Sequence, residues 1–539
     1  MSNETMNDDT FRGSGGKELK GKLLSGLFWV LLANLIIKPF WILGIEVDVQ
    51  NAVGDTTYGF YFVVFNLTYI FNILLDLGVT NFNARNIARN PLLIQKHLSG
   101  ILTIKVLLLV LYVVVTFTTA LLLGYDSQQF RLLAWLCFNQ FLNSLIAYLR
   151  SNFQGLLMFR MDSLLSVLDR ILMIVICGFL LRGPFCAQQQ GIFRIQWFVY
   201  AQTAAYLLAA TVALIAIGKT VGLQRLTWNK PFTLAILKKS APFALLVLLM
   251  ASYNRIDPIL LEKLLPVGGN FHAGIYAKAF RLLDALTMLS YLVSIPLLPI
   301  YSKLTKEVST EKEREGNAKA STGKGGQTLD VAKRESSTKE LADITRMTFS
   351  LMVFVTVSIA STLFWFGDGV LDMLYHGNAN AGNVNHVFRI LILGYIPIGL
   401  TYIFGTLLTA NGSLRQLNLC AALALVVNIG VNLVCIPRWA ASGAAVASLT
   451  TQSFMGVAQM ILAFRIFHFR PRQGYILRLL AFVVLVLISC YLLSALQGCM
   501  AALTDIVAIA IMAAIAIIMA LVLRLIHPKE ILRFLKQDH

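Results

Sequence analysis

The feature that most constrains this chain is a series of apolar blocks, each roughly the 20 residues that one membrane-spanning helix needs. Lipid offers no hydrogen-bond partners, so each block is expected to be a helix that satisfies its own backbone. Only 13% of the residues are charged, against about 25% in an ordinary soluble domain. A soluble fold could not bury this much apolar surface. We therefore predict an all-α polytopic membrane protein.

The apolar pattern predicts about 14 transmembrane helices. A polar, basic leader at 1–22 precedes them, and the length of the first block suits a retained span. Residues 219–239 mix apolar and basic groups and are expected to form an amphipathic connector. Residues 302–341 are rich in Lys, Glu, Ser, Thr and Gly, which predicts a flexible loop. The expected spans are 23–45, 57–82, 97–123, 132–149, 163–181, 195–218, 240–262, 272–300, 347–366, 390–410, 416–434, 442–464, 479–496 and 506–523.

The distribution of Lys and Arg predicts the orientation of these spans. If the N-terminus is inside and sides alternate, inside segments hold 33 basic residues and outside segments hold 6. Without the whole inside segment between the spans 272–300 and 347–366, which contains this loop and holds 10 basic residues, the counts are still 23 and 6. Lys and Arg near span ends favour the cytoplasmic side, so both termini are expected to be cytoplasmic. The net charge of +18 then reflects topology and attraction to anionic lipid, and no nucleic-acid partner is expected.

A weak internal repeat suggests how the spans are organised. Gly59, Tyr61 and Phe65 recur as Gly274, Tyr276 and Phe280, an offset of 215 residues. Six spans precede the connector and six matching spans follow it. We therefore expect two six-helix bundles, and internal repeats of this kind are common in transporters, with the substrate between the halves. The bundles would cover 23–218 and 240–464, and 465–539 would hold helices 13 and 14 and a cytoplasmic tail.

Two stretches resemble a known family. YGFYFVVFNLTYIFNILLDLGVTNFNARNIAR at 58–89 is similar to the second helix of polysaccharide and lipopolysaccharide exporters. SYNRIDPILLEKL at 252–264 and AGIYAKAFRLLDALTMLSYLVSIPLLPIYSKL at 273–304 resemble their seventh and eighth helices. These are O-antigen or lipid-linked oligosaccharide flippases, in the superfamily that also holds the lipid II flippase and multidrug extruders.

The resemblance implies two bundles around a central cavity and transport by alternating access. The cargo would be an undecaprenyl-pyrophosphate-linked oligosaccharide, moved across a bacterial inner membrane. Membrane lipids and polysaccharide polymerase or ligase machinery would be its partners, and the chain would not be an enzyme. Two alternatives in the same superfamily stay open: a cation-coupled multidrug extruder and a lipid II flippase. A membrane-embedded enzyme would typically need a large catalytic outside loop, and the spacing of Asp and His in 367–389 fits no standard metal site.

Charges within the spans give the candidate site, because each costs at least about 2.5–3.5 kcal/mol at mid-bilayer and needs a wet cavity or a partner. Lys278 and Arg281 are three residues apart and share a helix face. Arg255 and Lys38 are expected at a similar depth. We predict that these four residues line a cationic cavity that binds pyrophosphate. The alternative is that Arg281 pairs with Asp284 and that Arg255 pairs with Asp257, which would leave little positive field.

Three acidic residues are candidates for coupling to H⁺ or Na⁺: Asp257, Asp284 and Asp76. Asp257 precedes Pro258, which can distort the helix there. An ion pair with a basic residue is the structural alternative for Asp76. Lys105 is expected to extend its ammonium toward the inner interface. Asp169 and Arg170 point about 100° apart on a helix and are expected to pair with other residues. No other cofactor, no metal and no catalytic residue is expected.

Overall fold

The computed structural model describes residues 36–37, 39–90, 93–156, 158–182, 193–221, 230–320, 327–375, 381–469, 473–499 and 504–525. These residues form helices and no strand, which confirms the predicted all-α class. The helices divide into two compact units, Met1–Ala251 and Ser252–His539. Their boundary falls inside helix α10 (Lys230–Arg255), which begins within the predicted connector and continues past it. We refer to the two parts as the N-terminal and C-terminal units.

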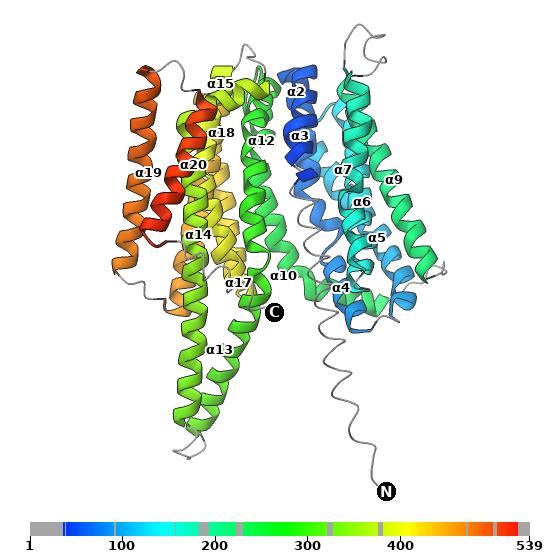
Figure 1. Ribbon diagram of the computed structural model, residues 1–539. Helices are drawn as coiled ribbons and strands as arrows, with labels where there is room; N and C mark the ends of the chain where they lie inside the picture. Colours follow the sequence, from blue (N-terminus) through cyan, green and yellow to red (C-terminus); the bar gives the residue numbers. More distant parts are fainter. Residues whose placement is uncertain are drawn as a thin grey trace. The chain divides into compact units, whose positions relative to one another are not determined.

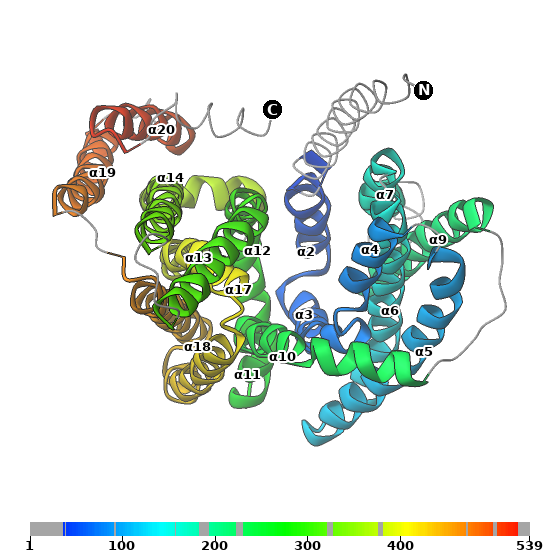
Figure 2. The same ribbon diagram turned by 90° about the horizontal axis from the view of Figure 1, so that it is seen from below.

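The N-terminal unit is built around α6 (Ser127–Gly155), which contacts α4, α5, α7 and α9 (Figures 1 and 2). A capping box fixes the start of α6. The Asp126 carboxylate accepts from the Gln129 backbone N–H at 2.7 Å, and the Asp126 N–H donates to the Gln129 side chain at 3.0 Å. The other elements are η1 (Trp41–Glu46), α2 (Val47–Val53), α3 (Asp55–Ile70), η2 (Asn72–Leu75), α4 (Val79–Arg89), α5 (Leu93–Leu122), α7 (Phe159–Arg182) and α9 (Ile195–Val221).

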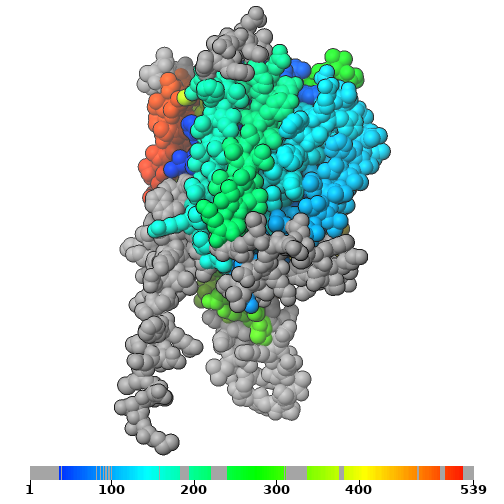
Figure 3. Space-filling model, turned by 90° about the vertical axis from the view of Figure 1, so that its right-hand side faces the viewer, coloured from blue at the N-terminus to red at the C-terminus, as the bar shows by residue number. Residues whose placement is uncertain are grey.

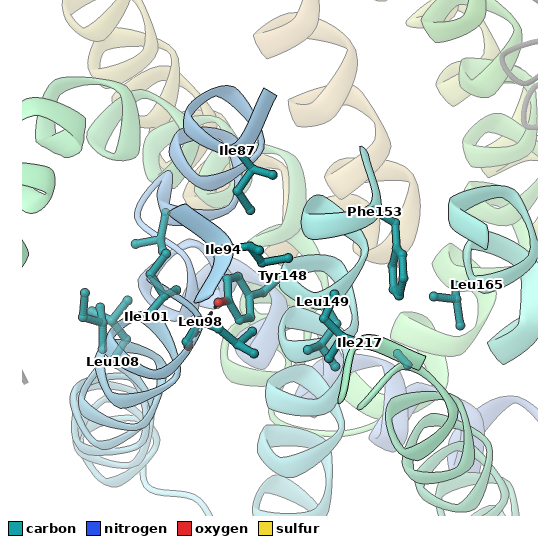
Figure 4. Packing of buried hydrophobic residues seen from close by; sticks show 13 residues of the cluster. Ile87, Ile94, Leu98, Ile101, Leu108, Tyr148, Leu149, Phe153, Leu165 and Ile217 are labelled. Atoms are coloured by element: carbon teal, nitrogen blue, oxygen red, sulfur yellow. Dashed lines mark hydrogen bonds between the residues drawn. The ribbon is translucent and has the colours of Figure 1, made fainter. Parts of the chain in front are cut away.

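The core of the N-terminal unit lies at the end of α6 where α4 and α5 meet it. Buried aliphatic and aromatic side chains from α4, α5, α6, α7 and α9 form one cluster (Figure 4). Tyr148 is fully buried there, and its hydroxyl donates to the Leu98 carbonyl at 3.3 Å. The residues labelled in the figure are Ile87, Ile94, Leu98, Ile101, Leu108, Tyr148, Leu149, Phe153, Leu165 and Ile217.

The C-terminal unit follows the same all-helical plan. Its longest element, α18 (Leu414–Phe467), is two helices joined at Ala440, whose φ of 46° is not helical. This break lies between the two spans predicted at 416–434 and 442–464. The remaining elements are α11 (Asp257–Leu264), α12 (Gly269–Ser294), α13 (Leu297–Ala320), α14 (Gln327–Tyr375), α15 (Ala381–Leu393), α16 (Tyr395–Leu400), η3 (Thr401–Gly405), α17 (Thr406–Ala410), α19 (Gln473–Cys499) and α20 (Asp505–Val522).

Length and composition make this a multi-pass membrane protein. Among the described residues, 9 helices are long and apolar enough to cross a bilayer, or up to 11 if each of two bent pairs is one span. The total of fourteen stays a prediction. Val106, Val110 and Val114 line one side of α5 and are each more than half exposed, as lipid-facing side chains would be. Helix α5 forms part of the face drawn in Figure 3.

The loop predicted at 302–341 is helical instead. Helix α13 continues to Ala320, and α14 begins at Gln327 and runs beside it (Figure 1). The prediction is therefore wrong for the backbone of 302–320 and 327–341, whereas 321–326 lie outside the described residues. The composition of this segment does exclude a buried core. It does not exclude a helix, because Glu, Lys and Ala are among the stronger helix formers.

The last two helices pack on α14. Residues of α20 spaced by four are buried in this contact: Ala508, Met512, Ala516 and Ala520. Such a stripe of mostly small residues lets two helices approach closely within a membrane. At its N-terminal end the Asp505 carboxylate accepts from the Gly369 backbone N–H at 2.7 Å. Helices α19 and α20 are therefore an integral part of the C-terminal unit.

Candidate functional site

A break between α10 and α11 positions the candidate site of the C-terminal unit. Helix α10 ends at Arg255, α11 begins at Asp257, and the two are bent by 48°. Pro258 occupies the first turn of α11, where its missing N–H removes no helical hydrogen bond. The bend separates Arg255 and Asp257, which the sequence left as possible partners. The Arg255 guanidinium pairs with Asp284, and the Asp257 carboxylate accepts a hydrogen bond from Tyr276.

Asp257 is fully buried and is held by neutral groups. Its Oδ2 accepts from the Tyr276 hydroxyl at 2.9 Å. Its Oδ1 accepts from Asn428 Nδ2 at 3.0 Å and from Asn432 Nδ2 at 2.8 Å. No Lys, Arg or His pairs with Asp257 in the part of the chain that the structure describes. An ionised carboxylate this deep costs several kcal/mol unless a positive charge compensates it.

The surroundings of Asp257 suit a small cation or a proton. Asn428 and Asn432 lie one turn apart on α18 and are both fully buried. Asn432 Nδ2 also donates to Asn428 Oδ1 at 3.0 Å. The Oδ1 of Asn432 is buried and accepts no hydrogen bond from any described residue. Carboxylate and amide oxygens are the ligands that hard cations prefer. We call Asp257, Tyr276, Asn428 and Asn432 the buried acid cluster.

A second group of charges comes from α12 and from the end of α10. Lys278 and Arg281 are 2% and 5% exposed, so the shared face that their spacing predicts is an interior one. Arg255 Nη2 lies 3.3 Å from Asp284 Oδ1, and Arg281 Nη1 lies 4.0 Å from Asp284 Oδ2. Asp284 therefore joins two of the predicted cationic residues. We call Arg255, Lys278, Arg281 and Asp284 the basic cluster.

Aromatic rings complete the basic cluster. The Arg255 guanidinium carbon lies 5.0 Å from the centre of the Phe280 ring. Lys278 Nζ lies 5.1 Å from the centre of the Tyr375 ring, and the Tyr375 hydroxyl donates to the Lys278 carbonyl at 3.0 Å. Cations over aromatic faces within about 6 Å are stabilised by the ring quadrupole. The side chains are thus held in place inside an apolar unit.

Of the predicted site residues, the structure brings together Arg255, Lys278, Arg281 and Asp284. The pairing of Arg281 with Asp284 that the sequence left open occurs at 4.0 Å, whereas Arg255 pairs with Asp284 and not with Asp257. Lys38 lies outside the described residues.

Asp76 belongs to the N-terminal unit and forms a buried ion pair there. Lys105 Nζ lies 2.6 Å from Asp76 Oδ1 and also donates to the Leu75 carbonyl at 3.0 Å and to Ser144 Oγ at 2.9 Å. Lys105 is 1% exposed, so the expectation that its ammonium reaches the inner interface is wrong. The physical reason is the break after α3, which places the Asp76 carboxylate and the Leu75 carbonyl beside α5.

The Lys105–Asp76 pair yields a stability prediction. Replacing Lys105 by Met removes one partner of a buried ion pair and is expected to lower stability by about 3 kcal/mol, the low end of the usual range because Asp76 is one-quarter exposed. Adding Asp76→Asn is expected to recover most of this loss. Thermal unfolding of the purified variants in detergent measures both effects. Equal stability of wild type and Lys105→Met would contradict a structural role for the pair.

The sequence did not predict the three partners of Asp257 or the ion pair between Asp169 and Arg170. Tyr276, Asn428 and Asn432 were assigned no role at Asp257, although the i, i+4 spacing of two Asn in an apolar helix was a usable signal. The expectation that Asp169 and Arg170 pair with other residues is also wrong. Arg170 Nε lies 3.5 Å from Asp169 Oδ2, because a long side chain can fold back to its neighbour despite their angular separation.

Comparisons with known proteins identify a family and a fold. A family model described as polysaccharide biosynthesis protein matches residues 23–305. Among solved structures, the fold is similar to that of the lipid II flippase MurJ in an inward closed conformation, with a TM-score of 0.61 and 14% identity, covering 92% of this chain and 97% of that one. No match was found among curated proteins.

The fold is also similar to that of multidrug transporters. One is an inward-facing multidrug resistance MATE family transporter of the MOP superfamily, with a TM-score of 0.54 and 15% identity, covering 81% of this chain and 94% of that one. Another is a mutant of the Vibrio cholerae MATE transporter VcmN, with a TM-score of 0.50 and 13% identity, covering 84% of this chain and 98% of that one. These likenesses show a shared transporter fold.

Proposed function

Because the chain belongs to the polysaccharide biosynthesis protein family, whose model covers residues 23–305, we propose that it is a flippase for a lipid-linked oligosaccharide. The cargo is an O-antigen unit or a related surface polysaccharide unit on undecaprenyl pyrophosphate. The chain moves it by alternating access, from the cytoplasmic to the periplasmic leaflet of a bacterial inner membrane. Both termini are cytoplasmic, the chain is a transporter and not an enzyme, and polymerase or ligase machinery receives the cargo.

The basic cluster is the observation that carries this proposal. Lys278 and Arg281 are almost fully buried on one face of α12, and Arg255 reaches the same carboxylate as Arg281. Burying several cations in an apolar unit is costly, so a role that requires positive charge is the simplest reason for it. A pyrophosphate needs Arg and Lys, which bind its oxygens through charge-assisted hydrogen bonds. Lys38 is the fourth residue that we propose to bind the cargo.

The buried acid cluster supports coupling of transport to H⁺ or Na⁺. Asp257 supplies the negative charge, and Asn432 Oδ1 supplies a second oxygen that faces no donor among the described residues. Cation binding would neutralise this carboxylate and change the energy of the bend between α10 and α11. Arg255 is the last residue before this bend. Cation binding at the buried acid cluster would therefore affect the geometry of the basic cluster.

A lipid II flippase is the second candidate. The MurJ structure covers 92% of this chain, against 81% for the inward-facing MATE transporter. Lipid II also contains a pyrophosphate, which a basic cluster would bind in the same way. The cation-coupled multidrug extruder fits less well. Cationic drugs favour an acidic cavity, whereas the best-clustered charges of the C-terminal unit are basic.

Deletion of the gene in its host tests the proposal and separates the candidates. We expect lipid-linked glycan to accumulate in the cytoplasmic leaflet and surface polysaccharide to disappear, with both defects reversed by the wild-type gene. Intact surface polysaccharide together with increased drug sensitivity would contradict the proposal and favour the extruder. Arrested peptidoglycan synthesis with lysis would favour the lipid II flippase.

A further inference from the structure

Helix α12 carries an exposed tyrosine on the same face as Asp284. Tyr291 is 54% exposed and lies seven residues after Asp284 in one continuous helix. Seven residues fall about 20° short of two turns, so the two side chains share a face and lie about 10 Å apart along the helix axis. The Arg255–Asp284 pair is itself partly exposed, at 14% and 24% of the two side chains. Because charges within a span face water or a partner and not lipid, this face of α12 is accessible to water.

Tyr291 has an aromatic neighbour on a second element. The centres of the Tyr291 and Tyr402 rings are 6.2 Å apart, and the ring planes are inclined by 55°. Tyr402 belongs to η3, a π-helical turn within the candidate span Gly382–Ala410. Such turns are rare and often occur at functional positions. The two rings form one aromatic surface, and we call Tyr291 and Tyr402 the aromatic pair.

The backbone that carries the aromatic pair is held by close packing. Tyr395 of α16 is fully buried, and its hydroxyl donates to the Leu286 carbonyl at 3.0 Å and accepts from Ser290 Oγ at 3.1 Å. These two bonds fix α12 against the segment that continues into η3. Gly405 lets η3 approach α18, because a Cβ at this position would lie 2.8 Å from Gln459 Oε1. Both rings are therefore presented by elements with a defined position in the C-terminal unit.

The chemistry of the aromatic pair suits a sugar. A sugar ring has C–H groups on its faces and hydroxyls at its edge. Aromatic faces carry partial negative charge and attract C–H groups, and a tyrosine hydroxyl can bond to a sugar hydroxyl. Thr287, which is half-buried between Asp284 and Tyr291, adds a third hydroxyl. Aromatic surface with a few fixed polar groups is typical of small-ligand sites.

The alternative is that the aromatic pair only anchors the protein at the membrane surface. Tyrosines are common where lipid headgroups meet water. An anchoring tyrosine faces lipid, whereas Tyr291 shares the face of the Arg255–Asp284 pair. A charged face of this kind favours a polar ligand over lipid chains.

We propose that the aromatic pair binds the saccharide part of the cargo, while the basic cluster binds its pyrophosphate. This assignment rests on the proposed flippase function and adds a second point of recognition to it. In a lipid-linked oligosaccharide the sugars follow the pyrophosphate directly. A separation of about 10 Å along α12 places the aromatic pair beyond the first sugar and beside those that follow it. The aromatic pair would therefore favour cargo with several sugars over cargo with one.

Flipping of two probes by the full-length protein in proteoliposomes tests the proposal. One probe is undecaprenyl pyrophosphate with a single N-acetylglucosamine, and the other is the lipid-linked oligosaccharide purified from the deletion strain. The rate at which each probe becomes accessible to periodate outside the vesicles is measured. In Tyr291→Leu/Tyr402→Leu we expect flipping of the oligosaccharide probe to fall about tenfold more than flipping of the single-sugar probe. Tyr291→Phe keeps the ring and is expected to retain most of the preference for the longer cargo.

Tyr491→Leu is the matched control, because Tyr491 is a 61% exposed tyrosine of α19 whose ring centre lies 6.0 Å from that of Trp365. It is expected to change neither rate. Thermal unfolding shows which variants fold, and the single variant Tyr291→Leu, at an exposed position, is used if the double variant does not. If the wild type flips neither probe, the proposed flippase function fails and this assignment fails with it. If the wild type flips both probes and a folded leucine variant loses both equally or neither, only the saccharide assignment is overturned.

Discussion

Replacing both Lys278 and Arg281 by glutamine is expected to reduce flipping of the lipid-linked oligosaccharide by about 100-fold or more. Two charge-assisted hydrogen bonds to pyrophosphate contribute about 1.5–3 kcal/mol each, and 1.4 kcal/mol corresponds to a factor of ten. Glutamine keeps a polar side chain and removes two buried charges, so the variant is expected to fold. The measurement is the rate at which cargo in proteoliposomes becomes accessible to an enzyme on the opposite side.

Lys263→Gln is the control for this experiment. It removes one cation from the same unit, but Lys263 lies at the end of α11, 3.4 Å from its neighbour Glu262, and 28% of its side chain is exposed. Its transport rate is expected to match the wild type. If the double variant is present at normal amounts, unfolds at the normal temperature and still flips cargo at the wild-type rate, the basic cluster does not bind the cargo.

Replacing Asp257 by Asn is expected to uncouple transport from the ion gradient. The amide keeps one oxygen that can accept from Asn428 and Asn432, and the Tyr276 hydroxyl can rotate to accept from the new NH₂ group. Because a buried charge is removed, stability is expected to stay equal or rise. Gradient-driven transport is expected to fall at least about tenfold, since the group that distinguishes the loaded from the empty site is gone.

The test applies a Na⁺ gradient and a pH gradient to proteoliposomes in separate experiments. The gradient that accelerates the wild type, and no longer accelerates Asp257→Asn, identifies the coupling ion. Asp368→Asn serves as the control, because Asp368 forms a half-exposed ion pair with Arg389 at 2.7 Å. A folded Asp257→Asn variant that responds to the gradient as the wild type does would contradict the coupling role.

Much of the fold could be predicted from local sequence patterns, because a membrane span is defined by consecutive residues. The spacing of Lys278 and Arg281 was enough to place both on one interior face. The hairpin of α13 and α14 was missed for a physical reason. A polar, Gly-containing composition rules out a core, but helix propensity is a separate property, and Glu, Lys and Ala supply it.

The partners of the buried charges could not be predicted from the sequence alone. Asn428 and Asn432 are 171 and 175 residues from Asp257, so their meeting depends on how α18 packs against α11. Asp76 and Lys105 meet because the chain breaks after α3, and an apolar segment predicted at 57–82 gave no sign of this break. Spacing rules hold within one helix and fail wherever a helix ends unexpectedly.

Helix α14 has a mechanical consequence. It runs for 49 residues without a break, about 74 Å at about 1.5 Å per residue, which is more than twice the hydrocarbon thickness of a bilayer. Its final residue, Tyr375, contacts Lys278, and its first turns belong to the hairpin with α13. A rod of this length amplifies small rotations: a tilt of about 3° around its midpoint moves each end by about 2 Å. A force that tilts the polar hairpin of α13 and α14 would therefore move the opposite end of α14, where Tyr375 contacts Lys278.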